Sequence, residues 1–332
     1  MTERIAVLGA GSWGTALAAH CARIGHDVRL WGRDDALVRD IIARRENPRY
    51  LPGIDIPPAV AITASVGHAV RDASMIVAAI PSHGTRAVLR AAAPAIPETA
   101  VIVSGTKGLE TGTLDRMSQV IAAEIAGRAI VVLSGPTFAA EVARGLPAAV
   151  VAASVEPDAA ARVQDAFKGP AFRLYATDDV AGVEFGGALK NVIAIAAGAV
   201  EGLGLGHNAM AALITRGLVE MSRLASAEGA RRDTLSGLSG LGDLVLTCTG
   251  DLSRNRQVGI ELGRGRTLHD ILSHMRMVAE GVRTTHAALA LGARHRVELP
   301  IAAQMAAVLD GRTSPRDAVE ALMLRRQRQE AE

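Results

Sequence analysis

The chain has 332 residues, of which 49% are hydrophobic and 2% aromatic, and its formal net charge at pH 7 is +2. This length is sufficient for two domains and a substantial core, built mainly from Ala, Val, Leu and Ile. Because the charge is nearly balanced and aromatic side chains are scarce, nucleic-acid binding is not expected as the main task. The two cysteines, Cys21 and Cys248, lie far apart in apolar segments, so no metal site is expected.

The amino terminus and the apolar pattern favour a cytoplasmic protein. A signal peptide is not expected because the first predicted strand begins almost at the amino terminus. No uninterrupted apolar stretch is suited to a membrane span. The two cysteines are interpreted as reduced core residues.

The amino-terminal segment combines an apolar run, a glycine motif and an Ala-rich stretch. Residues 5–8 predict a buried strand and residues 15–23 a helix, and Gly9, Gly11 and Gly14 between them have the spacing G-x-G-x-x-G. In such a motif the glycines allow a tight turn, close approach of a pyrophosphate, and close packing of helix on strand. The free N–H groups at the helix start bind phosphate. The segment predicts a dinucleotide site; a glycine turn that binds nothing is the alternative.

Apolar runs alternate with helical segments from residue 4 to about residue 175. This alternation predicts a Rossmann-like α/β domain, with a doubly wound, mostly parallel sheet covered by helices. Further strands are predicted at 28–31, 60–63, 75–80, 100–104, 129–133, 148–153 and 172–175. Helices are predicted at 34–45, 66–73, 83–93 and 113–126, with one more between the last two strands. The Pro-rich stretch 47–58 is expected to be a loop.

Beyond residue 178 the strand pattern fades and long helical segments follow. They are predicted at 183–200, 209–228, 254–263, 268–275, 282–291, 301–310 and 315–322. We therefore expect a dinucleotide-binding domain, residues 1–178, and a separate all-α domain, residues 179–332, for substrate binding and catalysis.

Polar segments follow three of the predicted strands. They are residues 80–83, 104–108 and 134–137. In a doubly wound sheet, ligands bind beyond the carboxyl ends of the strands, so three polar segments at one edge favour a site. Any one of these segments alone is compatible with a simple turn. His83 is interpreted as a loop or helix-start residue, not as a ligand.

Lysine is rare in this chain: of 36 basic residues, only Lys107, Lys168 and Lys190 are lysines. A bias toward arginine would replace lysines that supply only a charge, so the remaining ones are candidates for tasks that need a compact ammonium or a releasable proton. Lys168 precedes a turn and is interpreted as a surface residue.

Lys190 lies in the predicted helix 183–200, which is apolar nearly all round and is expected to be buried. Burial lowers the pKa of a lysine toward neutrality, which suits it to general acid–base catalysis. A structural lysine–carboxylate pair is the alternative. Asp243, which follows a Gly-rich stretch, is a candidate partner, or it is an ordinary helix cap.

Ser253, Arg254 and Asn255 begin another predicted helix. A helix start with free N–H groups, a guanidinium and an amide suits a phosphate monoester. A solvated, capped helix start is the alternative.

Seven motifs occur in a recognisable order: GAGSWGTALA, SGTKGLE, SGPTFAAEVARGLP, GGALKNVIAIAAG, GLGDLVLTCT, SRNR and VAEG. With this order and spacing, the chain resembles NAD(P)-dependent glycerol-3-phosphate dehydrogenases of the bacterial, biosynthetic type, from about residue 4 to residue 310. The resemblance implies interconversion of sn-glycerol 3-phosphate and dihydroxyacetone phosphate by hydride transfer with NAD(P), which supplies glycerol 3-phosphate for phospholipid synthesis. It also implies a homodimer.

The same resemblance implies roles for individual residues. Lys190 is expected to accept and donate the proton at the substrate C2 oxygen, and Lys107 to hold the substrate. Asn191, Asp243 and Thr247 are expected to order the lysines and hydroxyls. The other implied substrate contacts are Gly135, Thr137, Ser253, Arg254 and Asn255, the last three at the phosphate. The expected cofactor contacts are Gly9, Gly11, Ser12, Trp13, Gly14, Arg33, Lys107, Ala139, Arg254, Val278 and Glu280.

The segment after the second strand bears on the choice of cofactor. Arg33 suits the 2′-phosphate of NADP, whereas Asp34 either caps the next helix or faces the ribose hydroxyl, which would favour NAD. We expect both cofactors to be accepted, with NADPH favoured.

Other functions are compatible with the same architecture. The nearest is a dehydrogenase that acts on a hydroxy acid or sugar acid, which would need Arg or Ser facing a carboxylate where phosphate is expected here. A non-catalytic dinucleotide sensor is another, but it leaves Lys107 and Lys190 unexplained. Methyl transfer is disfavoured by the helical domain and by these two lysines.

Overall fold

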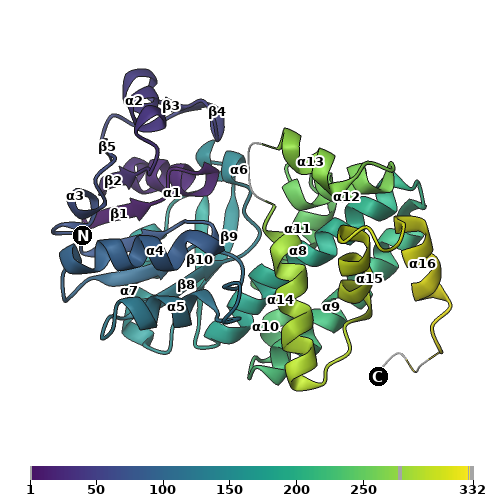
Figure 1. The fold of residues 1–332 in the computed structure, drawn as a ribbon. Coiled ribbons are helices and arrows are strands. Elements are labelled where there is room, and N and C mark those ends of the chain that lie inside the picture. Colours follow the sequence, from purple (N-terminus) through teal and green to yellow (C-terminus); the bar gives the residue numbers. More distant parts are fainter. Residues whose placement is uncertain (1, 276–278, 328, 330–332) are drawn as a thin grey trace.

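The computed structural model describes residues 2–275, 279–327 and 329 (Figure 1). An α/β half, purple to teal in Figure 1, contains the sheet, and a helical half, green to yellow, follows it in the chain. The chain passes between the halves where the last strand of the sheet leads into a long helix. The predicted combination of a mostly parallel sheet and an all-helical second part is confirmed.

The large sheet has eight strands in the order β10-β9-β8-β7-β6-β1-β2-β5. They are β1 (Arg4–Leu8), β2 (Asp27–Trp31), β5 (Val60–Thr63), β6 (Met75–Ala78), β7 (Val101–Ser104), β8 (Ile130–Ser134), β9 (Ala148–Ala153) and β10 (Phe172–Thr177). All neighbouring strands are parallel except β8 and β9. After β1 the chain builds toward β5 and then returns to add β6 on the other side of β1. This reversal opens a crevice at the carboxyl ends of β1 and β6, where ligands bind in such sheets.

Helices cover both faces of this sheet. They are α1 (Ser12–Arg23), α2 (Asp35–Arg44), α3 (Val66–Val70), α4 (Ser82–Ala92), α5 (Met117–Glu124), α6 (Ala139–Ala143) and α7 (Pro157–Phe167). The short helix α6 was not predicted, and α5 is shorter than expected because Leu114 has a left-handed backbone (φ 69°) just before it. The apolar side chains of α1, α2 and α7 pack on one face of the sheet, and those of α3, α4 and α5 on the other.

The prediction of a loop at residues 47–58 is wrong. Here β3 (Glu46–Asn47) and β4 (Leu51–Asp55) form a two-stranded antiparallel sheet. The prolines and glycine of this stretch predict a loop, but Leu51 and Ile54 bury their side chains against Ala16 of α1 and Ala143 of α6. Tertiary packing outweighs the local signal.

The helical half is built around one buried helix, α8 (Val180–Gly202) (Figure 1). Around it lie α9 (Gly206–Ala227), α10 (Arg232–Ser236), a π-helical turn (Leu238–Gly242), α11 (Asp243–Thr249), α12 (Arg254–Gly263), α13 (Leu268–His274), α14 (Glu280–His295), α15 (Pro300–Leu309) and α16 (Pro315–Met323). The segment from α10 to α11 was not predicted as helical. Because α8 begins at Val180, a domain boundary after residue 178 is reasonable, but it stays a prediction.

The expectation that no stretch is suited to a membrane span needs a correction. By length and composition α8 qualifies as a span, but 89% of its most apolar window is buried inside the protein. The apolar surface of α8 is covered by other helices of the chain, as in the core helix of a globular domain.

Candidate active site between the glycine loop and helix α8

The glycine loop between β1 and α1 forms a cradle at the crevice. Gly9 has a φ of +118°, and a Cβ there would lie 2.4 Å from the carbonyl oxygen of Ala79. A Cβ on Gly14 would lie 1.9 Å from the carbonyl oxygen of Gly9, whereas Gly11 faces open space. Gly11 also begins α1 without a side-chain cap, so the first N–H groups of the helix are free. A cofactor pyrophosphate fits this cradle, and Gly9 and Gly14 admit no larger residue.

The three polar segments predicted at the sheet edge meet there. Thr106 donates a hydrogen bond of 2.8 Å to the carbonyl of Ile80, which ties the segment after β7 to the one after β6. The Nζ atom of Lys107 donates to the carbonyl of Gly135, after β8, at 3.0 Å. The prediction that these segments share one edge is confirmed, because β6, β7 and β8 are parallel.

Two lysines, one from each half, share a single buried carboxylate. The Nζ atom of Lys107 lies 2.6 Å from Oδ2 of Asp243, and Nζ of Lys190 donates to its Oδ1. Lys190 also donates to the hydroxyl of Thr247 at 2.8 Å, one turn along α11 from Asp243. Asp243 is fully buried and its side chain holds both ammonium groups. It is therefore not an ordinary helix cap.

The electrostatics of this cluster bring Lys190 into the neutral pH range. Burial lowers the pKa of Lys190, the carboxylate of Asp243 raises it, and the nearby ammonium of Lys107 lowers it; the net result is a pKa of about 7. The side chain of Lys107 is more exposed, at 19% compared with 8% for Lys190. Lys190 is thus a buried group that can gain or lose a proton near pH 7.

Family models match both halves of the chain. The model described as NAD-dependent glycerol-3-phosphate dehydrogenase N-terminus matches residues 4–160, and the one described as its C-terminus matches residues 179–320. The chain belongs to the NAD-dependent glycerol-3-phosphate dehydrogenase family.

Individual relatives agree along the whole length. A glycerol-3-phosphate dehydrogenase (NAD(P)+) of Koribacter versatilis (strain Ellin345) is 52% identical over 328 residues, which cover 97% of both chains. The protein of the same name from Nitratidesulfovibrio vulgaris (strain DP4) is 52% identical and covers 98% of this chain and all of its own. A crystal structure of glycerol-3-phosphate dehydrogenase from Coxiella burnetii superposes with a TM-score of 0.94 at 40% identity, and covers 98% of this chain and 99% of that one.

In this glycerol-3-phosphate dehydrogenase family member, the residues expected at the substrate phosphate lie at the start of α12. Ser253 is the N-cap and accepts a hydrogen bond from the N–H of Arg256 at 3.2 Å. Arg254 is exposed, and Asn255 is buried. Ser253 therefore caps the helix, but it is buried and not solvated. The expected phosphate contacts of all three residues stay predictions.

Asn255 links two helices beside the lysine pair. Its Nδ2 donates to Oδ1 of Asn191 at 2.9 Å, and its Oδ1 accepts from the N–H of Gly281 at 3.0 Å. Asn191 follows Lys190 on α8, so this chain of bonds connects the start of α12 and the start of α14 to the helix that carries Lys190. This link supports the expected role of Asn191 in ordering the lysines and hydroxyls of the site.

The residues expected at the cofactor lie around the crevice, except Val278, which is outside the described residues. Trp13 and Ala139 both pack against the apolar cluster that contains Ala16 of α1. Ser12 is the first residue of α1, and Arg33 lies exposed just beyond β2. Thr137 donates to the carbonyl of Gly135 within their own loop, at 3.2 Å.

Glu280, an expected cofactor contact, forms hydrogen bonds to the α/β half that the sequence did not predict. Its carboxylate accepts hydrogen bonds from the hydroxyl of Ser82 at 2.7 Å and from the N–H of Ser82 at 3.3 Å. Ser82 begins α4 in a segment that was singled out, but nothing in the sequence indicates its partner. Asp34 caps α2 by accepting from the N–H groups of Ala36 and Leu37, and it pairs with Arg49 at 3.0 Å. Its alternative contact with the ribose hydroxyl stays a prediction.

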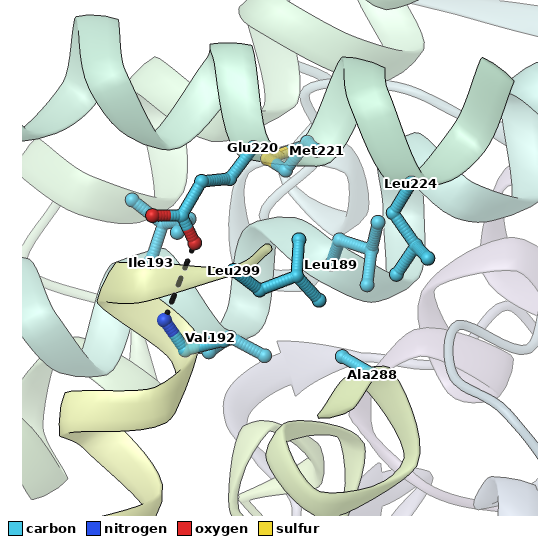
Figure 2. Close-up of a pocket in the computed structure, with 9 residues that line it drawn as sticks. Leu189, Val192, Ile193, Glu220, Met221, Leu224, Ala288 and Leu299 are labelled. Atoms are coloured by element: carbon cyan, nitrogen blue, oxygen red, sulfur yellow. Dashed lines mark hydrogen bonds between the residues drawn. The ribbon is translucent and has the colours of Figure 1, made fainter. Parts of the chain in front are cut away.

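Another buried carboxylate, Glu220, lies on the other side of α8, in a small cavity that Figure 2 shows. Glu220 of α9 accepts hydrogen bonds from the N–H groups of Ile301 at 2.6 Å and of Ala302 at 3.3 Å. The cavity has a volume of about 20 Å³, and Leu189, Val192 and Ile193 of α8 contribute to its apolar lining. It is large enough for one water molecule and too small for a substrate. Among the described residues, no group of three or more His, Cys, Asp or Glu side chains is arranged to hold a metal.

Proposed function

We propose that this chain interconverts sn-glycerol 3-phosphate and dihydroxyacetone phosphate with NAD or NADP, and so supplies glycerol 3-phosphate for phospholipid synthesis. The observation that carries the proposal is the buried cluster of Lys107, Asp243 and Lys190 beside a glycine cradle suited to a dinucleotide. A nicotinamide held there supplies or accepts the hydride. The family membership of the chain supports the choice of reaction.

Lys190 is the proton donor in the direction of reduction and the acceptor in the direction of oxidation. Reduction of a ketone places negative charge on the C2 oxygen, and a protonated Lys190 beside that oxygen neutralises the charge and then transfers its proton. A pKa of about 7 lets the same side chain serve both directions near neutral pH. Asp243 and Thr247 hold the ammonium in place by the hydrogen bonds described above.

Lys107 and the start of α12 orient the substrate. Lys107 is more exposed than Lys190 and presents a second cation to the substrate oxygens. Arg254, Ser253 and the free N–H groups at the start of α12 bind the phosphate, which is remote from the reacting carbon. Binding energy at this end fixes the position of C2 and so lowers the barrier.

For the cofactor we propose that both NADP and NAD are accepted, with NADPH favoured. Arg33 lies where the 2′-phosphate of NADP would be placed, after the second strand. Asp34 is already engaged by the α2 N–H groups and by Arg49, so it is poorly placed to select the ribose hydroxyl of NAD. A homodimer and a cytoplasmic location stay predictions.

The experiment follows the absorbance of NADPH, and then of NADH, with dihydroxyacetone phosphate as substrate. Turnover of dihydroxyacetone phosphate is expected with both cofactors. Turnover of unphosphorylated dihydroxyacetone is expected to be far slower. Equal turnover of the two ketones would favour a dehydrogenase of another substrate class. Tight NADPH binding without turnover of dihydroxyacetone phosphate would favour a dinucleotide sensor and would refute the proposal.

A further inference from the structure

Two exposed arginines near the crevice, Arg33 and Arg283, have no carboxylate partner among the residues that the structure describes. Arg33 follows β2, and its sequence neighbour Asp34 pairs with Arg49 instead. Arg283 lies on the exposed face of α14, and within the described part of the chain it makes no ion pair or hydrogen bond. An unpaired surface arginine is common, so their significance depends on where they lie relative to each other.

The fold brings these two arginines, one from each half, to the same end of the crevice. Arg33 lies two residues beyond the end of β2, and His83 is the second residue of α4, which follows β6. Because β1 alone separates β2 from β6, those strand ends are about 10 Å apart. The bonds from Ser82 to Glu280 place the start of α14 against the start of α4. Arg283 follows one turn later, about 4.5 Å along the axis of α14.

The shifted pKa of His83 indicates that the positive charges of Arg33 and Arg283 both lie close to it. Burial is the largest cause that lowers the pKa of His83, the positive charges of Arg283 and Arg33 lower it further, and the carboxylate of Glu280 opposes them. Glu280 adds a negative charge to this cluster, but Ser82 already donates two hydrogen bonds to it. The mouth of the crevice therefore has two guanidinium groups near His83, and among the described residues neither has an ion-pair partner.

We propose that Arg283 and Arg33 together bind the 2′-phosphate of NADPH, so that the helical half contributes to cofactor selection. This rests on the dinucleotide site of the proposed function and extends it by one residue from the other half of the molecule. A guanidinium presents paired N–H donors that match phosphate oxygens, and two of them suit a dianion. NADH lacks this phosphate, so its binding does not depend on Arg283.

The test measures equilibrium binding of NADPH, NADH, 2′,5′-ADP and 5′-AMP to the wild type and to Arg283→Gln. Loss of one charge-assisted contact is expected to weaken NADPH and 2′,5′-ADP about tenfold, and NADH and 5′-AMP by less than about threefold. Arg33→Gln is expected to give the same pattern. Arg283→Lys is expected to recover part of the loss, because it restores the charge without the fork.

Arg294→Gln is the matched control, because Arg294 is exposed on the last turn of the same helix, far from the crevice. It is expected to bind all four ligands as the wild type does. Equal weakening of NADPH and NADH by Arg283→Gln, or an effect no larger than that of Arg294→Gln, overturns the proposal. These measurements concern cofactor binding, not catalysis. A failure of turnover with dihydroxyacetone phosphate would refute the proposed reaction without deciding whether Arg283 binds the 2′-phosphate.

Discussion

The two faces of α8 each have a buried titratable group, and the two groups have opposite surroundings. On one face, Lys190 is bound by side chains of Asp243 and Thr247, which come from another helix at the crevice. On the other face, Glu220 projects from α9 toward apolar side chains (Figure 2). It accepts hydrogen bonds from two backbone N–H groups of α15, those of Ile301 and Ala302. Burial is the largest cause of the pKa shift in both cases, and it brings both values to about 7.

The comparison shows that a pKa near neutrality does not by itself identify a catalytic group. Pro300 begins α15 and has no N–H to offer, so Glu220 takes up the next two N–H groups of that helix and acts as its cap. Its cavity has about the volume of one water molecule. Lys190 differs because it lies with a second lysine and a cofactor cradle at one crevice. The convergence of polar groups, not the shifted pKa, distinguishes the catalytic face.

Lys190→Met is expected to have the largest effect on activity. Loss of the proton donor and of its charge near the C2 oxygen lowers kcat for reduction of dihydroxyacetone phosphate by about a thousandfold. Binding of NADPH and the midpoint of thermal unfolding are expected to change little. Steady-state kinetics and equilibrium binding check both parts.

The control for this variant is Lys168→Met, because Lys168 is exposed and, among the residues described, pairs with Asp165 alone. It is expected to retain wild-type kcat. A nearly normal kcat for Lys190→Met would show that Lys190 is not the proton donor. The buried groups on the two faces of α8 would then both be structural.

Glu220→Gln is expected to alter stability and leave activity unchanged. In the folded protein the pKa of Glu220 is raised to about 7 from its ordinary value of 4.5. Between these two values the unfolded chain is deprotonated and the folded chain is protonated, so wild-type stability falls as the pH rises. The fall is up to about 3 kcal/mol and is complete above pH 7.

The variant has no carboxyl group to titrate, so its free energy of unfolding lacks this decrease. Urea unfolding at pH 5 and at pH 8 measures the difference. Parallel pH dependence in the two proteins would contradict the assignment of a raised pKa to Glu220. A large loss of kcat at pH 7 would contradict its purely structural role.

Much of the fold could be predicted from the sequence because the signals are local. The strands at 60–63 and 148–153 and the helix at 254–263 have the predicted bounds, since each is a short apolar or well-capped segment. The helical turn within residues 237–242 was not predicted, because four of these six residues are glycine or serine, which favour loops. In the structure, residues 238–242 form a π-helical turn that packs closely against α8. This packing exists only in the folded chain.

The same division applies to the candidate site. Lys190 was found because a lone ammonium in an apolar helix is costly unless it is used or paired, and Asp243 because a carboxylate was needed. Ser82 and Glu220 gave no such signal. Glu220 lies on a helix with charged neighbours, and its partners are backbone N–H groups, which every sequence has. Such partners are chosen by tertiary packing alone.

Asp243→Asn is expected to shift the pH dependence of reduction. Asp243 raises the pKa of Lys190 whereas Lys107 lowers it, so removal of the carboxylate charge lowers that pKa below about 7. Reduction needs protonated Lys190, and its rate is expected to fall at a lower pH than in the wild type. Each unit of downward shift costs about tenfold in protonated Lys190 above both values. Profiles of kcat/KM against pH test this, and an unchanged or upward-shifted midpoint would contradict it.

Thr247→Val is expected to have the smallest effect, because it removes one hydrogen bond and keeps the shape and charge of the site. The Thr247 hydroxyl accepts from Lys190 at 2.8 Å and donates to the carbonyl of Asp243 at 2.6 Å. Its loss is expected to lower kcat about fivefold, equivalent to about 1 kcal/mol. Thr249→Val is the matched control, since Thr249 lies on α11 and donates to the carbonyl of Val245 at 2.8 Å but is exposed. If both variants lost activity equally, the cause would be the helix and not the contact with Lys190.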